Sequence, residues 1–199
     1  MTTEPLADSP KPIWMRASTI AFLVFVIALI IRLLGIQWGL PSQSNHWSRH
    51  PDEPVIWAYS QQIKPAEGKF TPGFYNYGTL YLTMLRVATD VVNGYGGSAD
   101  PKDPDAGWKA MARYHLAGRV LSALSGAGMA AVLVLLLLKR TNIIGAIFGG
   151  LLIAFSPGLV IHSQFQTVDM VATFLLLLSV FFAFQVFEKP DLATKPALL

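Results

Sequence analysis

Two adjacent carboxylates follow the first long apolar segment and are the residues best suited to chemistry. Asp52 and Glu53 lie in the run His50-Pro51-Asp52-Glu53, and tryptophan and tyrosine residues flank this run on both sides. A carboxylate in a partly apolar site has a raised pKa and accepts a proton, and two acids together also suit a divalent cation. The structural alternative is a helix N-cap beside a surface acid.

A second candidate group surrounds Asp169, which begins the last apolar segment. Acids are less costly near the end of a membrane span than at its middle, so Asp169 is either an N-cap, with Thr167 as its competitor, or a second acidic site. His50 and His162 are candidate ligands or bases. For His162, the alternative is an ordinary polar residue at the membrane surface.

Three arginines lie in or beside apolar segments. Arg113 and Arg119 stand at the outer entrance of the second segment, where a guanidinium suits the bidentate binding of a lipid phosphate. Their alternative role is plain headgroup contact or pairing with an acid. Arg32 lies inside the first segment, and its long side chain can extend to the outer headgroups.

The composition indicates a membrane protein. Of the 199 residues, 53% are hydrophobic and only 14% are charged, whereas soluble domains have about 25% charged residues. The chain has no cysteine, which excludes disulfides and thiolate metal sites. The net charge of +3 comes without a dense basic tract, so no nucleic-acid partner is expected.

Basic residues flank the apolar segments and predict an all-α protein with four transmembrane helices. Lys11 and Arg16 precede the first segment, Lys139-Arg140 follows the second, and Lys189 follows the fourth. If these flanks are cytoplasmic, the first segment is an uncleaved signal anchor in the plasma (inner) membrane. The predicted order is a cytoplasmic N-terminus (1–16), TM1 (17–38), an extracytoplasmic loop (39–115), TM2 (116–138), a cytoplasmic turn (139–142), TM3 (143–161), an extracytoplasmic link (162–169), TM4 (170–187) and a cytoplasmic tail (188–199).

The long loop is predicted to contain two helices. A short one begins with Asp52 as its N-cap. A second covers 78–95, where polar residues recur every three or four positions and Arg86 can pair with Asp90. Such a stripe favours a helix lying in the membrane interface, and the alternative is a fifth span. On the second span, small residues at successive i+4 positions, Gly118, Ser122, Gly126 and Ala130, predict close helix packing.

Together these residues resemble a known family. The sequence is similar to the first span and first outer loop of GT-C glycosyltransferases, in the branch of protein O-mannosyltransferases and bacterial lipid-carrier-dependent relatives. The segments that carry the resemblance are Arg32 to Gly35, Gly39 to Pro41, His50 to Glu53, Pro72 to Gly78, Gly118 to Ser122, Ala154 to Pro157 and Asp169.

The resemblance implies an inverting transfer of a sugar from a polyprenyl-phosphate donor to an acceptor hydroxyl at the outer face. Asp52 would be the general base, and Glu53 would orient the acceptor or assist. Asp169 would support the site or a divalent cation, although the sequence leaves the metal unknown, and Arg119 would steady the departing lipid phosphate.

Family members have many more spans, so two functions are open. The chain is either the N-terminal module of a mannosyltransferase-like enzyme or a shortened, non-catalytic subunit that packs against other membrane proteins. A transporter is a weaker third alternative, because the middles of the later spans are nearly free of charge.

Overall fold

A computed structural model describes residues 17–96 and 103–188, which are helical with no β-strand among them. Lys11, Arg16, Lys189 and Lys195 and the N-terminal stretch 1–16 lie outside the described residues. The elements are α1 (Ala17–Leu33), α2 (Asp52–Ser60), the 3₁₀ turn η2 (Pro65–Glu67), α3 (Thr79–Gly96), α4 (Ala106–Leu137), α5 (Ile143–Phe155), α6 (Pro157–Ser163) and α7 (Val168–Glu188).

Two or three of these helices are long and apolar enough to cross a membrane. They are α4, α7 and, if they count as one bent span, α5 with α6. The first predicted span is shorter than expected, because α1 ends at Leu33 and has 17 residues. Conversely, α4 begins ten residues before the predicted start at 116. These lengths indicate a membrane protein.

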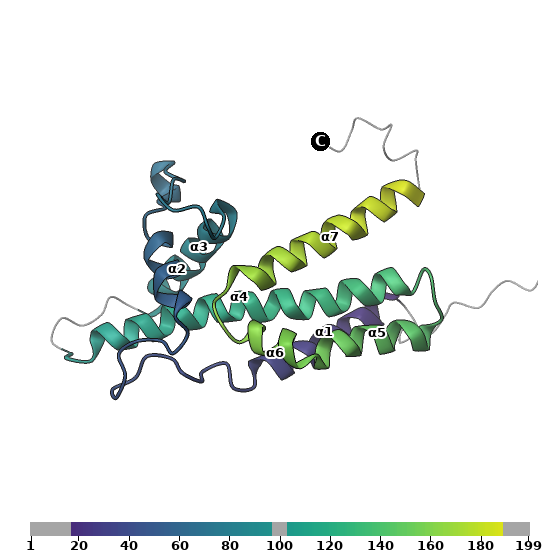
Figure 1. The fold of residues 1–199 in the computed structure, drawn as a ribbon, viewed down its shortest axis with the longest axis horizontal. Coiled ribbons are helices and arrows are strands. Elements are labelled where there is room, and N and C mark those ends of the chain that lie inside the picture. Colours follow the sequence, from purple (N-terminus) through teal and green to yellow (C-terminus); the bar gives the residue numbers. More distant parts are fainter. Residues whose placement is uncertain (1–16, 97–102, 189–199) are drawn as a thin grey trace, which may run out of the picture.

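The long α4 is the centre of the fold. Figure 1 shows α1 and α5 along one side of α4, while α7 diverges from it toward its own C-terminal end. Small residues of α1, α4 and α5 make a tight core, which includes Ala28, Ala127 and Ala154. Gly118 and Gly126 of α4 are closely approached by Gln166 and by Arg32 with Ser163, which confirms the predicted small-residue ridge.

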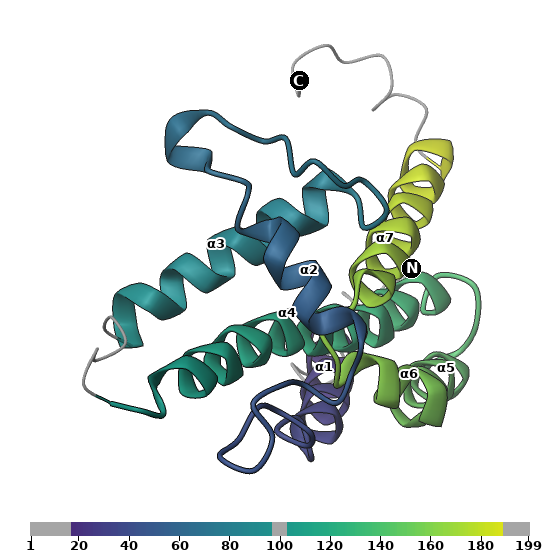
Figure 2. The same cartoon turned by 60° about the vertical axis from the view of Figure 1, so that its left-hand side comes forward.

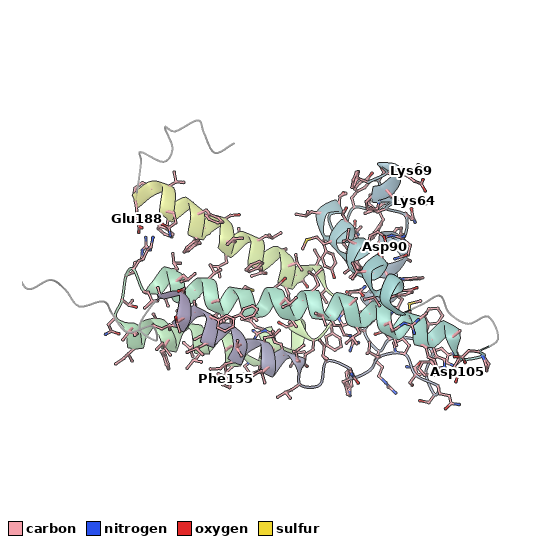
Figure 3. All side chains as sticks on the ribbon, turned by 180° about the vertical axis from the view of Figure 1, so that it is seen from behind. Lys64, Lys69, Asp90, Asp105, Phe155 and Glu188 are labelled. Atoms are coloured by element: carbon pink, nitrogen blue, oxygen red, sulfur yellow. The ribbon has the colours of Figure 1, made fainter. Side chains whose placement is uncertain are left out.

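The loop helices α2 and α3 form a separate cluster beside the N-terminal half of α4 (Figure 2). Its core contains Ile56, Leu82 and Leu85, and Val171 at the start of α7 closes it. The predicted pair in α3 is present, with Arg86 Nη2 2.8 Å from Asp90 Oδ1. The opposite end of the molecule holds Glu188, far from Asp90 in Figure 3, where Lys139 and Arg140 both pair with Glu188.

The third apolar segment is not one straight helix. Pro157 has no N–H to donate and disfavours helical geometry at the residue before it, and Ser156 is accordingly extended with φ −60° and ψ 116°. As a result α5 and α6 meet at a 55° bend. Ile153 O would accept a hydrogen bond from the amide of residue 157 in a regular helix, and because Pro157 has no N–H this carbonyl has no intrahelical donor.

Arg32 supplies the missing donors at this break. Its Nη2 donates to Ile153 O (3.1 Å) and its Nη1 to Ala154 O (3.2 Å), while its Nε donates to Ser163 Oγ (3.1 Å). The side chain is fully buried, so Arg32 does not extend to the headgroups. A buried cation at the C-terminal end of α5 also matches the negative end of the helix dipole.

We expect Gly126→Ala to destabilise the fold by about 1–3 kcal/mol, because the added methyl overlaps Ser163 Oγ and Arg32 Nε. The measurement is the unfolding midpoint in detergent. Gly158→Ala in α6 is the matched control, since nothing lies within 4 Å of its added methyl. Equal midpoints for the two variants would contradict the close packing at Gly126.

Candidate functional site

The two adjacent acids face different surroundings. Helix α2 begins at Asp52, and the N-cap is Pro51, without a side-chain capping bond. The predicted N-cap role of Asp52 is therefore wrong: Asp52 is in the first turn, and its backbone amide donates to His50 Nδ1 at 3.3 Å. Its exposed carboxylate has no hydrogen-bond or ion-pair partner among residues 17–96 and 103–188. Consecutive helix residues point about 100° apart, and Glu53 is fully buried.

Glu53 forms a bidentate ion pair with Arg119 of α4. Arg119 Nε donates to Glu53 Oε1 and Arg119 Nη2 to Glu53 Oε2, both at 2.8 Å, and both side chains are fully buried. Arg119 Nη1 also donates to the carbonyls of Ile36 (2.8 Å) and Trp38 (2.7 Å), just beyond α1. The pair therefore joins α2 and the segment after α1 to the central helix.

Two further segments complete the network around Glu53. The backbone N–H of Gln166, in the link between α6 and α7, donates to Glu53 Oε1 at 2.7 Å. The side-chain Nε2 of Gln166 also donates to Glu53 O (3.2 Å), and the Ser48 hydroxyl donates to Glu53 Oε2. Gln166 Oε1 also lies 3.3 Å from Nδ1 of the buried His115. Both carboxylate oxygens are thus saturated, which a buried charge requires.

Burial would by itself raise the pKa of Glu53. The bonds and positive charge of Arg119, with smaller contributions from Ser48 and the Gln166 amide, outweigh burial and hold this pKa below its ordinary value. Glu53 consequently remains ionised, unlike the proton-accepting carboxylate of raised pKa that the sequence suggested for this pair.

The low pKa predicts acid sensitivity. A carboxyl with a depressed folded-state pKa stabilises the fold fully above its unfolded pKa, and this contribution is lost as the pH falls toward the folded pKa. We expect the unfolding midpoint to fall between about pH 5 and pH 3, and to fall less in Glu53→Gln, which cannot titrate there. Thermal unfolding across this pH range is the measurement, and identical pH profiles would contradict the assignment.

Arg119 is not placed to bind a lipid phosphate, because its side chain is fully buried and four of its five N–H donors are already used. Its guanidinium makes four hydrogen bonds at 2.7–2.8 Å and is completely enclosed, with the ring of Phe165 5.2 Å away. Arg113, about two turns earlier, is partly exposed and makes no hydrogen bond or ion pair with residues 17–96 and 103–188. The two arginines, for which the sequence predicted the same role, therefore differ: Arg119 is buried in an ion pair, whereas Arg113 is accessible.

Asp52 and Asp169 border the same end of α3. Asp169 is exposed in the first turn of α7. Burial raises the pKa of Tyr77, and the charge of Asp52 raises it further. Tyr81, one turn into α3, also has a raised pKa through burial, followed by the charges of Glu53 and Asp169. Asp52 and Asp169 therefore each act on a tyrosine at the N-terminal end of α3.

The two candidate histidines are not brought together. His50 packs against Phe165, with ring centroids 4.6 Å apart. His162 is exposed in the last turn of α6. Among the residues that the structure describes, no group of three His, Cys, Asp or Glu could hold a metal ion.

Sequence reasoning missed Gln166, Ser48 and His115, which support Glu53 directly or through Gln166. The detectable signal was the polar run before Asp169, because two glutamines and a threonine are unusual between apolar helices. Their partner could not be identified, since Gln166 is 113 positions from Glu53.

Comparisons with protein-family models, with curated proteins and with solved structures find no match in any of the three.

Proposed function

We propose that the chain is the N-terminal module of a GT-C glycosyltransferase of the plasma (inner) membrane. In this proposal four segments cross the membrane, the N-terminus is cytoplasmic, and the α2–α3 cluster lies outside. The observation that carries the proposal is the division of the acidic pair: Glu53 is held rigidly by Arg119, while the carboxylate of Asp52 is exposed and unpartnered among the described residues.

The reaction is the inverting transfer of a sugar from a polyprenyl-phosphate donor. Asp52 takes the proton of the acceptor hydroxyl as the acceptor oxygen bonds to the anomeric carbon, and the bond from that carbon to the phosphate oxygen breaks. The lipid phosphate leaves with the bonding electron pair. A positioned general base suits this chemistry. The buried Glu53–Arg119 pair holds α2 in place and so helps to position Asp52.

Asp169 is assigned a supporting role at the same site, either toward the acceptor or toward a divalent cation. Arg119 acts by positioning α2, because it is fully buried and four of its five N–H donors are already used. His50 and His162 stay candidate ligands or bases.

A non-catalytic subunit is the second candidate. It is favoured by α7, whose apolar side chains are widely exposed, as with Leu176 (66%) and Phe187 (86%). These side chains would face either lipid or another membrane protein.

The test of the enzyme proposal is sugar transfer by the native-length protein in vesicles. Radiolabelled polyprenyl-phosphate mannose and a hydroxyl acceptor peptide are supplied, and labelled product is counted. Transfer supports the enzyme. Absence of transfer from mannosyl and glucosyl donors, with stoichiometric copurification of another membrane protein, would support the subunit instead.

A further inference from the structure

An apolar groove lies between α3 and α4, away from the acidic site. Its volume is about 520 Å³. On α4 the lining residues follow i, i+3, i+4 and i+7 spacing, and on α3 they follow i, i+3 and i+4, so one face of each helix forms the groove. The small Ala88 and Ala117 leave the space open. The lining residues are Ala88, Val91, Val92, Arg113, Leu116, Ala117 and Val120.

Among the residues that the structure describes, Arg113 is the only charged one in this lining. Its guanidinium makes no ion pair with any carboxylate of residues 17–96 and 103–188. The nearby basic residue Lys109, in contrast, pairs with Asp103 at 2.8 Å and with Asp105 at 3.7 Å. An unpaired cation beside an otherwise apolar groove is complementary to a molecule with an anionic head and a hydrocarbon tail.

The position of Arg113 along α4 matches the depth of lipid headgroups. From Val120 to Leu137 the helix carries no charged residue, which corresponds to about 27 Å of hydrocarbon at 1.5 Å per residue. Arg113 precedes this stretch by two turns, at about 10 Å along the axis. A phosphate at Arg113 would thus let an acyl chain run past Leu116 toward Val120, into the bilayer.

The groove meets α3 well beyond the end of this helix that borders Asp52. The charge of Asp52 raises the pKa of Tyr77, which lies just before α3 begins. The groove meets α3 at Ala88 to Val92. Along a helix this separation is about 17–22 Å, several times the size of one sugar ring.

We propose that the groove between α3 and α4 binds one anionic membrane phospholipid, with its phosphate on Arg113 and an acyl chain between the two helices. This bound lipid fixes α3 against α4. It does not depend on the transferase proposal, because it requires only that α4 crosses a membrane.

Native mass spectrometry of the full chain released from mixed vesicles tests this site. The vesicles contain equal phosphatidylglycerol and phosphatidylcholine. We expect the wild-type protein to retain one phosphatidylglycerol with about a fivefold preference over phosphatidylcholine, the effect of one cation near the headgroups. Arg113→Gln should abolish the preference, and Arg113→Lys should keep most of it.

Two further variants separate the groove from general charge attraction. Ala117→Phe fills the groove and should reduce retention of both lipids, with Ala88→Leu as the alternative where the larger residue prevents folding. Arg49→Gln, at an exposed loop arginine, is the matched control and should behave as wild type. Unchanged preference in Arg113→Gln, loss of preference in Arg49→Gln, or displacement of phosphatidylglycerol by equimolar undecaprenyl phosphate would overturn the proposal.

Discussion

Asp52→Asn should lower sugar transfer by the native-length protein by about 10²- to 10⁴-fold, the usual contribution of a positioned general base. Asparagine keeps the size of the side chain but cannot take the proton of the acceptor hydroxyl. The carboxylate of Asp52 is exposed, and the bond to His50 uses its backbone amide, so folding should be unaffected. The initial rate of transfer is the measurement.

Glu67→Gln is the matched control for this variant. Glu67 is also an exposed acid of the loop, but it pairs with Lys64 and Lys69. It should retain the wild-type rate. Undiminished transfer in Asp52→Asn would remove the general base from the proposed mechanism.

Glu53→Gln should destabilise the fold by about 3–5 kcal/mol, the cost of removing one partner of a buried ion pair. Glutamine preserves the shape of the side chain, so little of this loss comes from a cavity. The cost arises because the charge of Arg119 stays fully buried with no carboxylate against it. The free energy of unfolding in mixed micelles is the measurement.

The adjacent Asp52→Asn is the control for Glu53→Gln. Exposed substitutions of this kind usually change stability by less than about 0.5 kcal/mol. If both neighbours changed stability equally, the buried and exposed positions assigned to them would be wrong.

Features set by local sequence were predictable. The polar stripe of α3 follows from helical periodicity, and the Arg86–Asp90 pair follows from i, i+4 spacing. The small residues of α4 likewise predicted where other segments approach closely, as at Gly126. In each case the residues that make up the sequence pattern lie within a few turns of one helix.

Features set by distant partners were not predictable. Arg119 is 66 positions from Glu53, and composition cannot distinguish a pairing arginine from one that meets lipid phosphate. Arg32 was expected at the headgroups, because the sequence does not reveal that Arg32 lies beside the Pro157 break, more than 120 positions away, whose carbonyls need donors. The division of Asp52 and Glu53 depends on the orientation of α2, which its core contacts at Ile56 determine.

The central claim is that the buried Glu53–Arg119 pair fixes α2 on the central helix α4. A double-mutant cycle with Glu53→Gln, Arg119→Gln and the combined variant measures this pair directly, as the coupling in the free energy of unfolding. We predict a coupling of about 2–3 kcal/mol, with the double variant more stable than the sum of the single losses implies. Additive losses, with coupling near zero, would contradict the account.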